Sequence, residues 1–318
     1  MRPNHSPVSI KEDPTMLEHS KLLHDSWLRW AAESKEDADI CIMGVPFDGA
    51  VSLNAGAAQA PETLRMLSID LSDVNEDWVP IKKGILYDIG DLPVSLQWEK
   101  YFSDVEAKAY ELMKAGKFCL FLGGDHSVTI PLHKAYGKYQ RDSKPDAKIG
   151  VIHFDAHFDL CHEYDDHKWS HACTEARALE GVITGDDLFF VGVRVAENDE
   201  LELIRKNPGI TVVRAIDVHT HGIQSVLEKM QEKFRDYDAL YLTIDIDVLD
   251  PAFAPGTGTP VSGGLTSIQL IQLFKQMIET LPIKAMDIVE VAPPLDVNDI
   301  TSWAALRLIL ELFAHFSS

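Results

Sequence analysis

Residues 149–159 read IGVIHFDAHFD, an apolar run that leads directly into aspartates and histidines. Two other apolar runs end in the same way: 118–122 precedes GGDHS, and 239–243 precedes IDID. Continuous apolar runs of this length are typical of parallel strands that helices cover on both faces. Ligands of open parallel sheets bind at the carboxyl ends of the strands. We therefore expect the three polar clusters to meet at one edge of a parallel sheet.

The rest of the chain alternates between strand-length apolar runs and segments with helical periodicity. The apolar runs lie at 39–44, 84–89, 118–122, 149–154, 188–193, 210–214, 239–246 and 284–291. The helical segments lie at 104–115, 127–139, 174–180, 222–235, 266–280 and 302–316. Ser103 with Glu106, and Thr266 with Gln269, have capping-box spacing and are predicted helix starts. This alternation predicts an α/β protein with helices on both faces of a parallel sheet.

No linker, repeat or low-complexity tract divides the chain. We predict an N-terminal tail with an accessory helix at 1–37, followed by one domain at 38–318. The accessory helix, near 16–33, is expected to pack on its own domain or on a neighbouring subunit through Leu17, Leu22, Leu23, Trp27 and Trp30.

The composition restricts the partners. With 29 Lys and Arg against 50 Asp and Glu, the formal net charge is −21, which disfavours nucleic acid and anionic membranes and favours a small cationic ligand. No apolar run reaches transmembrane length, and the polar segment 1–14 lacks the core of a signal peptide. The four cysteines show no CxxC spacing, which is typical of reduced thiols. We expect a cytoplasmic protein.

The three clusters carry residues that bind hard divalent cations. In an extended segment residues i, i+2 and i+4 point the same way, so Asp155, His157 and Asp159 share one side, as do Asp245 and Asp247. With His126 they make six oxygen and nitrogen ligands, too many for one tetrahedral zinc. Such a set suits two octahedral-leaning ions, such as manganese, with one or two bridging carboxylates.

A pair of ions lowers the pKa of a water between them enough to give hydroxide near neutral pH. Four aspartates, two divalent ions and one hydroxide leave a net charge of −1, which a singly cationic substrate would neutralise. GxSxG, P-loop and GxGxxG motifs are absent from the sequence, so serine hydrolase, nucleotide hydrolase and Rossmann dehydrogenase functions lack support. Six other histidines are predicted to lie on the surface or to be hydrogen-bonded in the core: His133, His153, His162, His167, His219 and His221.

These motifs resemble those of the ureohydrolase family, which includes agmatinase, arginase, guanidinobutyrase and formimidoylglutamase. The resemblance spans about 38–316, is closest to agmatinase-like members, and includes GVPFD at 44–48. It implies the three-layer α/β/α arginase/deacetylase-like fold with a central eight-stranded parallel sheet. The other matching stretches are GGDHS (123–127), DAHFDL (155–160), DIDVLDPAFAPGTGTPVSGGL (245–265) and DIVEVAPPLD (287–296).

The resemblance also implies roles for individual residues. One ion would be held by His126, Asp155, Asp159 and Asp245, and the other by Asp155, His157, Asp245 and Asp247, so that Asp155 and Asp245 bridge. Glu290 matches the glutamate that binds the guanidinium group, and His171 matches the histidine that transfers protons. We predict His171, Asp247 and Glu290 as catalytic residues. Two Mn²⁺ ions are expected, with Ni²⁺ as the alternative, in a homo-oligomer (trimer or hexamer).

The loop at 160–169 indicates the substrate. Arginases hold the substrate's α-carboxylate and α-amine through Asn, Ser and Thr side chains in this loop, and none occurs here before Ser170. Glu163, Asp165 and Asp166 would repel a carboxylate and attract a distal ammonium, and Glu163 is predicted to contact substrate. Agmatine, cleaved to putrescine and urea, fits best; guanidinobutyrate, guanidinopropionate and free guanidine stay open. Three aromatic residues, Phe158, Tyr164 and Trp169, are expected to narrow the pocket.

Two other classes of function stay open. An acyl-lysine or polyamine deacetylase shares the implied fold but uses a single zinc, and the six-ligand set and Glu290 argue against it. A non-catalytic subunit of a mixed oligomer would bind without releasing urea.

Overall fold

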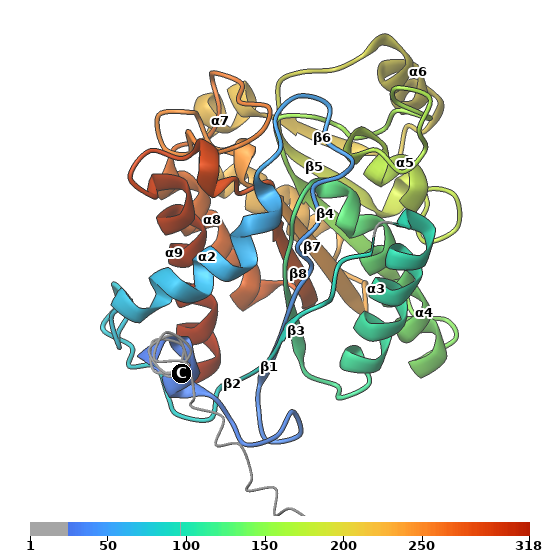
Figure 1. Cartoon of the computed structure of the whole chain (residues 1–318). Coiled ribbons are helices and arrows are strands. Elements are labelled where there is room, and N and C mark those ends of the chain that lie inside the picture. The colour runs from blue at the N-terminus through green and yellow to red at the C-terminus, as the bar shows by residue number, and fades with distance from the viewer. Residues whose placement is uncertain (1–24, 96) are drawn as a thin grey trace, which may run out of the picture.

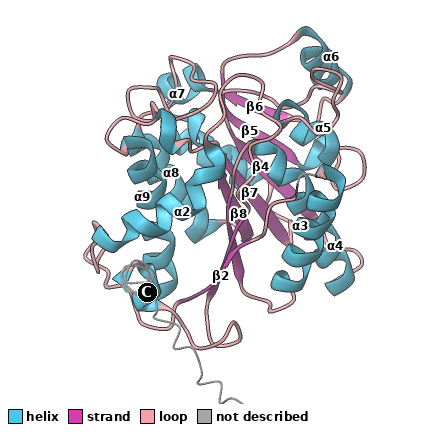
Figure 2. Ribbon diagram, in the orientation of Figure 1, coloured by secondary structure: helices cyan, strands magenta, loops and turns pink. Residues whose placement is uncertain are grey.

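A computed structural model describes residues 25–95 and 97–318. Its centre is one eight-stranded sheet in the order β2-β1-β3-β8-β7-β4-β5-β6, and every neighbouring pair is parallel. Figure 2 shows this sheet between two layers of helices. The strands are β1 (Ile40–Gly44), β2 (Leu86–Asp91), β3 (Phe118–Leu122), β4 (Ile149–Phe154), β5 (Leu188–Val193), β6 (Thr211–Arg214), β7 (Ala239–Asp245) and β8 (Ile283–Val289). The predicted three-layer fold is confirmed, with each strand within a few residues of its predicted run.

Helices α2, α7, α8 and α9 cover one face of the sheet, and α3, α4 and α5 cover the other (Figure 1). Each face has its own apolar core, which is why the strands are continuous apolar runs. The helices are α2 (Ala60–Leu67), α3 (Trp98–Met113), α4 (Thr129–Ser143), α5 (Thr174–Ala178), α6 (Asn198–Lys206), α7 (Ala215–Lys233), α8 (Ser267–Thr280) and α9 (Ile300–Ser317). The 3-10 turns are η1 (Trp27–Trp30), η2 (Ala57–Gln59), η3 (Ser68–Asp70), η4 (His126–Val128), η5 (His171–Cys173), η6 (Gly185–Asp187), η7 (Ile246–Val248) and η8 (Pro293–Leu295).

The two predicted helix starts have different outcomes. The capping box of Thr266 and Gln269 is confirmed at the start of α8. The start predicted at Ser103 is wrong, because α3 begins at Trp98 and Ser103 lies inside it. The rings of Trp98 and Phe102 both pack against Phe47. The apolar face of α3 therefore begins about one turn before Ser103, the residue predicted to cap the helix. Helices α2 and α6 were not predicted.

The N-terminal segment packs on its own domain as far as the structure describes it. Leu17, Leu22 and Leu23 of the predicted accessory helix lie outside the described residues. Trp27 and Trp30 lie in η1, and each packs edge-on against Phe313 of α9 at 6.1 Å between ring centroids. The boundary at residue 37 stays a prediction.

Among the residues described, no helix has both the length and the apolar character that crossing a membrane requires. The four cysteines are buried and unpaired.

Candidate metal centre and active site

The four central strands of the sheet deliver the predicted site residues. Strands β3, β8, β7 and β4 are consecutive in the sheet, and their carboxyl ends precede His126, Glu290, Asp247 and Asp155 in turn. Side chains far apart in sequence therefore meet at one edge, as expected from the strand ends.

The glycine pair before His126 lets the chain pass close to its own backbone. A Cβ on Gly124 would lie 1.7 Å from the carbonyl oxygen of Phe47, and one on Gly123 would lie 2.4 Å from a methyl of Val289. The next residue, Asp125, donates its amide to that same Phe47 oxygen at 2.7 Å. Any side chain in the pair would displace His126 from the site.

The first group of ligand atoms surrounds the Nδ1 atom of His126. This nitrogen lies 3.1 Å from Asp155 Oδ2, 3.1 Å from Asp159 Oδ2 and 3.4 Å from Asp245 Oδ2. The four side chains are nearly completely buried. They are the set predicted to hold one ion.

The second group is centred on His157. Its Nδ1 atom lies 3.2 Å from Asp155 Oδ1 and 3.2 Å from Asp247 Oδ2. Asp155 thus presents Oδ2 to the first group and Oδ1 to the second, as a carboxylate bridging two ions must. Asp245 faces the first group through Oδ2, while its Oδ1 accepts the amide of Asp247 at 2.8 Å. The predicted bridge through Asp245 stays a prediction.

The hydrogen bonds of His126 show that this donor set fits a cation. The Thr243 hydroxyl donates its proton to Asp287 Oδ1 at 2.6 Å, so it accepts from His126 Nε2, 2.8 Å away. With its proton on Nε2, a neutral His126 directs the Nδ1 lone pair at three carboxylate oxygens. Lone pairs facing one another in a buried site require a cation between them.

The carboxylates are too close to be charged without compensation. Burial, followed by the charges of Asp247 and Asp155, raises the pKa of Asp245 well above its usual value. At Asp155, burial by itself would also raise the pKa. Hydrogen bonds from His126, His153 and His157 outweigh burial and hold the pKa of Asp155 well below the usual range. Two divalent ions at this site would supply the positive charge that these histidines otherwise carry.

We expect metal binding to weaken as the pH falls. Burial favours neutral histidine, but hydrogen bonds to the carboxylates outweigh it, raising the pKa of His126 well above 6.5 and that of His157 to about 12. Both rings are therefore protonated in the metal-free protein at neutral pH and must lose a proton to bind a metal. Affinity should fall about tenfold per pH unit for each proton released. Calorimetric Mn²⁺ titrations in two buffers of different ionisation enthalpy measure this release, and pH-independent affinity would contradict the assignment.

His153 and Glu175 support the centre behind Asp155. His153 Nε2 lies 3.0 Å from Asp155 Oδ2, and its Nδ1 lies 2.9 Å from Glu175 Oε1. His153 is buried and hydrogen-bonded in the core, but it also lies with His126, Asp155 and Asp159 in a group that could hold a metal ion, so its assignment as a non-ligand stays a prediction. Its support of Asp155 was not predicted, although its position two residues earlier in an extended segment puts it on the same side.

Glu290 and His171 are brought together beside the metal ligands. Glu290 Oε1 accepts from the His126 amide and lies within hydrogen-bond distance of His171 Nδ1, both at 2.9 Å. Burial alone lowers the pKa of His171, but the hydrogen bond and charge of Glu290 raise it to about 9. Glu290 has a φ of 59°, a strained conformation for a residue with a side chain. Its amide donates to the Gly124 carbonyl at 2.8 Å, which ties this strained residue to the end of β3.

Ser52 completes the environment of His171. The Ser52 amide donates to His171 Nε2 at 3.0 Å, and its hydroxyl lies 2.9 Å from the same nitrogen. Because Nε2 accepts, the neutral ring carries its proton on Nδ1 and donates to Glu290. Ser52 was not predicted, since 119 residues separate it from His171 and no local pattern links them.

A cavity of about 330 Å³ opens over the ligands. His157, Asp159 and His171 lie among its lining residues, together with Tyr164 and Glu197. Glu163, Asp165 and Asp166 are exposed and do not line it, so the predicted contact of Glu163 with substrate stays a prediction.

Of the three aromatic residues expected to narrow the pocket, Tyr164 alone lines the cavity. The expectation is wrong for Phe158 and Trp169. Phe158 is buried against Phe190 at 5.1 Å, and Trp169 packs on Phe102 at 5.6 Å between ring centroids.

Comparisons with known proteins agree with this geometry. A family model described as the Arginase family matches residues 38–314. The chain is 36% identical over 283 residues to an agmatinase of Neisseria meningitidis serogroup C, covering 86% of each. It superposes on the agmatine ureohydrolase of Thermoplasma volcanium with a TM-score of 0.79 and 28% identity, covering 89% of this chain and 92% of that one. For the formimidoylglutamase of Bacillus subtilis subsp. subtilis str. 168 the TM-score is 0.83 at 25% identity, covering 90% of each.

Proposed function

This chain belongs to the arginase family, and from that premise we propose that it hydrolyses the guanidino group of agmatine to give urea and putrescine. The family resemblance carried by the sequence motifs is confirmed. The observation that carries the proposal is the position of the Asp155 carboxylate. Its Oδ2 atom faces His126 and its Oδ1 atom faces His157. The agmatinases among its relatives support agmatine as the substrate.

The two ligand groups would hold two divalent ions, with Mn²⁺ proposed and Ni²⁺ as the alternative. The first group is His126, Asp155, Asp159 and Asp245, and the second is Asp155, His157, Asp245 and Asp247. When bound, such ions act as Lewis acids that make water a nucleophile near neutral pH.

Glu290 positions the guanidinium beside these ligands. Its Oε1 atom is occupied by the His126 amide and His171, which leaves Oε2 to accept from the planar guanidinium. A Cβ on Gly258 would lie 3.6 Å from Oε2, so the glycine leaves space next to this oxygen. The buried carboxylate and its fixed partners orient the reacting carbon before the reaction begins.

His171 supplies the proton that the departing amine needs. It lines the cavity, and the hydrogen bond and charge of Glu290 raise its pKa. The ring therefore takes up a proton on Nε2 readily once this nitrogen no longer accepts from the Ser52 amide. Contact with Glu290 and Ser52 fixes the orientation of the ring. A protonated imidazole in this position acts as a general acid for the leaving amine.

Glu197 is proposed to attract the distal ammonium of agmatine. Glu197 and Glu200 both line the cavity, but Glu200 is buried and its carboxylate already accepts the amides of Leu160 and Glu197. An acid near the opening favours a substrate with a cationic end and disfavours the carboxylate of guanidinobutyrate. The proposed selective acid therefore lies after β5, and the contact predicted for Glu163 in the loop at 160–169 stays a prediction.

We expect Glu197→Gln to raise KM for agmatine two- to fivefold with little change in kcat. An exposed charge contributes about 0.2–1 kcal/mol, which is a factor of about 1.4 to 5, and the expected change lies in the upper part of this range. Glu163→Gln removes the same charge from the loop outside the cavity and should leave KM unchanged. Steady-state measurement of KM for agmatine in the two variants decides which acid attracts the ammonium. A larger rise in KM for Glu163→Gln than for Glu197→Gln would favour the contact predicted from sequence.

The proposed setting is cytoplasmic, in a homo-oligomer of three or six chains, with no nucleic acid or membrane partner. The net charge of −21 supports the exclusion of polyanionic partners. Sedimentation equilibrium of the metal-loaded protein measures the subunit number.

A urea-release assay over a panel of guanidino compounds tests the function. The panel contains agmatine, guanidinobutyrate, guanidinopropionate, free guanidine and arginine, each with Mn²⁺ and with Ni²⁺. Agmatine should give the highest kcat/KM. A higher kcat/KM for another guanidino compound would identify that compound, and not agmatine, as the substrate. Absence of urea release from every compound would favour a non-catalytic subunit.

A further inference from the structure

A buried carboxylate, that of Asp287, lies behind the metal ligands. Asp287 belongs to β8 and stands opposite Thr243 of β7 in the parallel register, and its side chain has no exposed surface. Residues paired in this way on neighbouring strands share one face of the sheet. Tyr241, two residues before Thr243, points to the same face. Asp287 is neither a predicted ligand nor a predicted catalytic residue.

Three hydroxyl groups donate to this carboxylate. Thr243 donates to Oδ1 at 2.6 Å, and Thr129 and Tyr241 both donate to Oδ2 at 2.8 Å. Burial, followed by the charge of Asp287, raises the pKa of Tyr241 well above its usual value, so the phenol keeps its proton. A hydroxyl has a single proton to donate. Each of the three can therefore only accept from any further partner.

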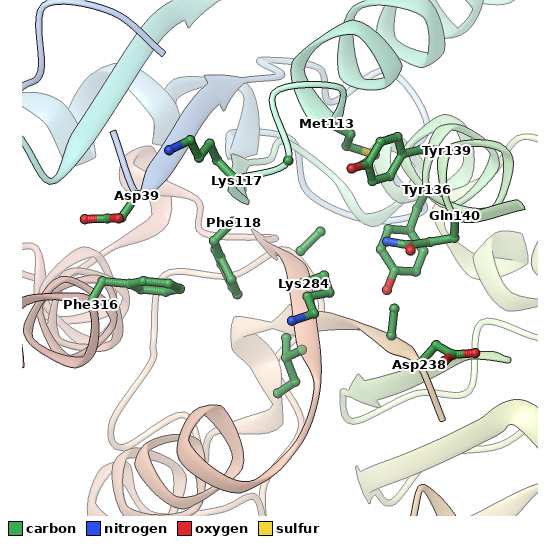
Figure 3. Close-up of a pocket in the computed structure, with 14 residues that line it drawn as sticks. Asp39, Met113, Lys117, Phe118, Tyr136, Tyr139, Gln140, Asp238, Lys284 and Phe316 are labelled. Carbon is green, nitrogen blue, oxygen red and sulfur yellow. The ribbon is translucent and has the colours of Figure 1, made fainter. Parts of the chain in front are cut away.

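The carboxylate is closed off on the side away from the ligands. The Tyr241 ring packs edge-on against that of Tyr136 at 5.2 Å between centroids. Tyr136 lines a second cavity, of about 510 Å³, at the amino ends of the strands (Figure 3). Neither Tyr241 nor Asp287 lines that cavity, and neither has exposed surface. Solvent in the second cavity therefore does not compete with the three hydroxyls for Asp287.

Thr243 connects this carboxylate to the first group of metal ligands. Its hydroxyl oxygen lies 2.8 Å from His126 Nε2 and must accept there, because its proton goes to Asp287. In a neutral histidine, the hydrogen bond of one ring nitrogen decides which nitrogen carries the proton. A proton held on Nε2 leaves the lone pair on Nδ1, the atom that lies 3.1 Å from an oxygen of Asp155 and 3.1 Å from one of Asp159.

Reversal of the Thr243 hydrogen bond would have the opposite effect on the site. If the Thr243 hydroxyl donated to His126 Nε2, the proton of the neutral ring would lie on Nδ1. That N–H group would then donate to the carboxylates of Asp155 and Asp159, where an ion requires a lone pair. The direction of one hydrogen bond thus decides whether His126 can bind an ion.

We propose that Asp287 is a positioning residue of the metal centre, which acts through the Thr243 hydroxyl to hold the proton of His126 on Nε2 and so directs the Nδ1 lone pair at the ion of the first group. This role rests on the binuclear centre of the proposed function and deepens it, because a carboxylate outside the ligand set then controls the affinity for one ion. Outer hydrogen-bond partners of metal-binding histidines change metal affinity about 10- to 100-fold.

Calorimetric Mn²⁺ titration of the full chain, stripped of metal, tests this role. Thr243→Val removes the acceptor with little change of shape and should weaken the binding of one ion about 10- to 100-fold, while the other ion binds as before. Thr243→Ser keeps the hydroxyl and should retain wild-type affinity. Tyr241→Phe is the matched control, since it removes a different hydroxyl from Asp287. It should bind both ions as the wild type does, even where the melting temperature falls.

A double-mutant cycle tests whether Asp287 acts through Thr243. Asp287→Asn should weaken the same ion at least severalfold, because an amide is a weaker acceptor and presents an NH₂ group in place of one oxygen. In the Thr243→Val background the same substitution should cause no further loss of affinity, since the connection to His126 is already broken.

Two results would overturn this role while leaving the proposed hydrolysis intact. The first is equal Mn²⁺ affinity in Thr243→Val and Tyr241→Phe, which would make both hydroxyls merely structural. The second is additive loss in the cycle, which would mean that Asp287 does not act through Thr243. A folded wild-type chain that binds fewer than two ions would overturn the role together with the binuclear centre.

Discussion

Asp155→Asn is expected to abolish turnover and to reduce metal binding below two ions per chain. Among the predicted metal ligands, Asp155 has its two oxygens facing different histidines, Oδ2 toward His126 and Oδ1 toward His157. The amide of asparagine keeps one neutral oxygen and presents an NH₂ group where the second oxygen was. Loss of a shared ligand removes several kcal/mol of stabilisation, so kcat should fall at least about 1,000-fold.

Asp166→Asn is the matched control. Asp166 is exposed in the loop after β4 and lies at a φ of 59°, a conformation that asparagine adopts readily. It should keep full activity and bind both ions. Near-normal turnover in Asp155→Asn, measured by urea release with metal content determined on the same sample, would refute the bridging role.

Glu290→Gln should lower kcat/KM for agmatine about 100- to 1,000-fold while both metal ions stay bound. The substitution keeps the size of the side chain but removes the charge that pairs with the guanidinium. Removing one partner of a buried, hydrogen-bonded charge pair costs about 2–5 kcal/mol. The change in kcat/KM follows directly from that cost, because each 1.4 kcal/mol is about tenfold.

Glu311→Gln provides the control for placing glutamine at a buried glutamate. Glu311 lies in α9, is 2% exposed, and accepts from the Asn75 side chain at 2.8 Å. It should leave agmatine kinetics unchanged even where it lowers the melting temperature. Unchanged kinetics in Glu290→Gln would make Glu290 a structural residue of the strand end.

The strand-end clusters were predictable because their signals are local. IGVIHFDAHFD contains both the buried strand and the ligands that follow it, so periodicity and position together identify the edge of the sheet. The same reasoning predicted all eight strands. Glu290 and His171 were assigned through the family resemblance, and the structure brings them to 2.9 Å of each other.

The remainder of the site depends on contacts that no local pattern records. Ser52 reaches His171 across 119 residues, and Glu197 enters the cavity because the segment after β5 runs beside the loop after β4. Conversely, the acids of the 160–169 loop formed a conspicuous pattern, yet Glu163, Asp165 and Asp166 are exposed and are not among the residues that line the cavity. Side-chain direction in an irregular loop is set by tertiary packing, which sequence periodicity does not report.

The most direct test of the binuclear centre is the number of metal ions bound to each chain. The folded protein would be loaded with Mn²⁺, desalted, and analysed by plasma mass spectrometry against its protein concentration. Two tightly bound ions per chain are predicted. One ion or none in a fully folded sample would contradict the binuclear centre and, with it, the proposed hydrolysis.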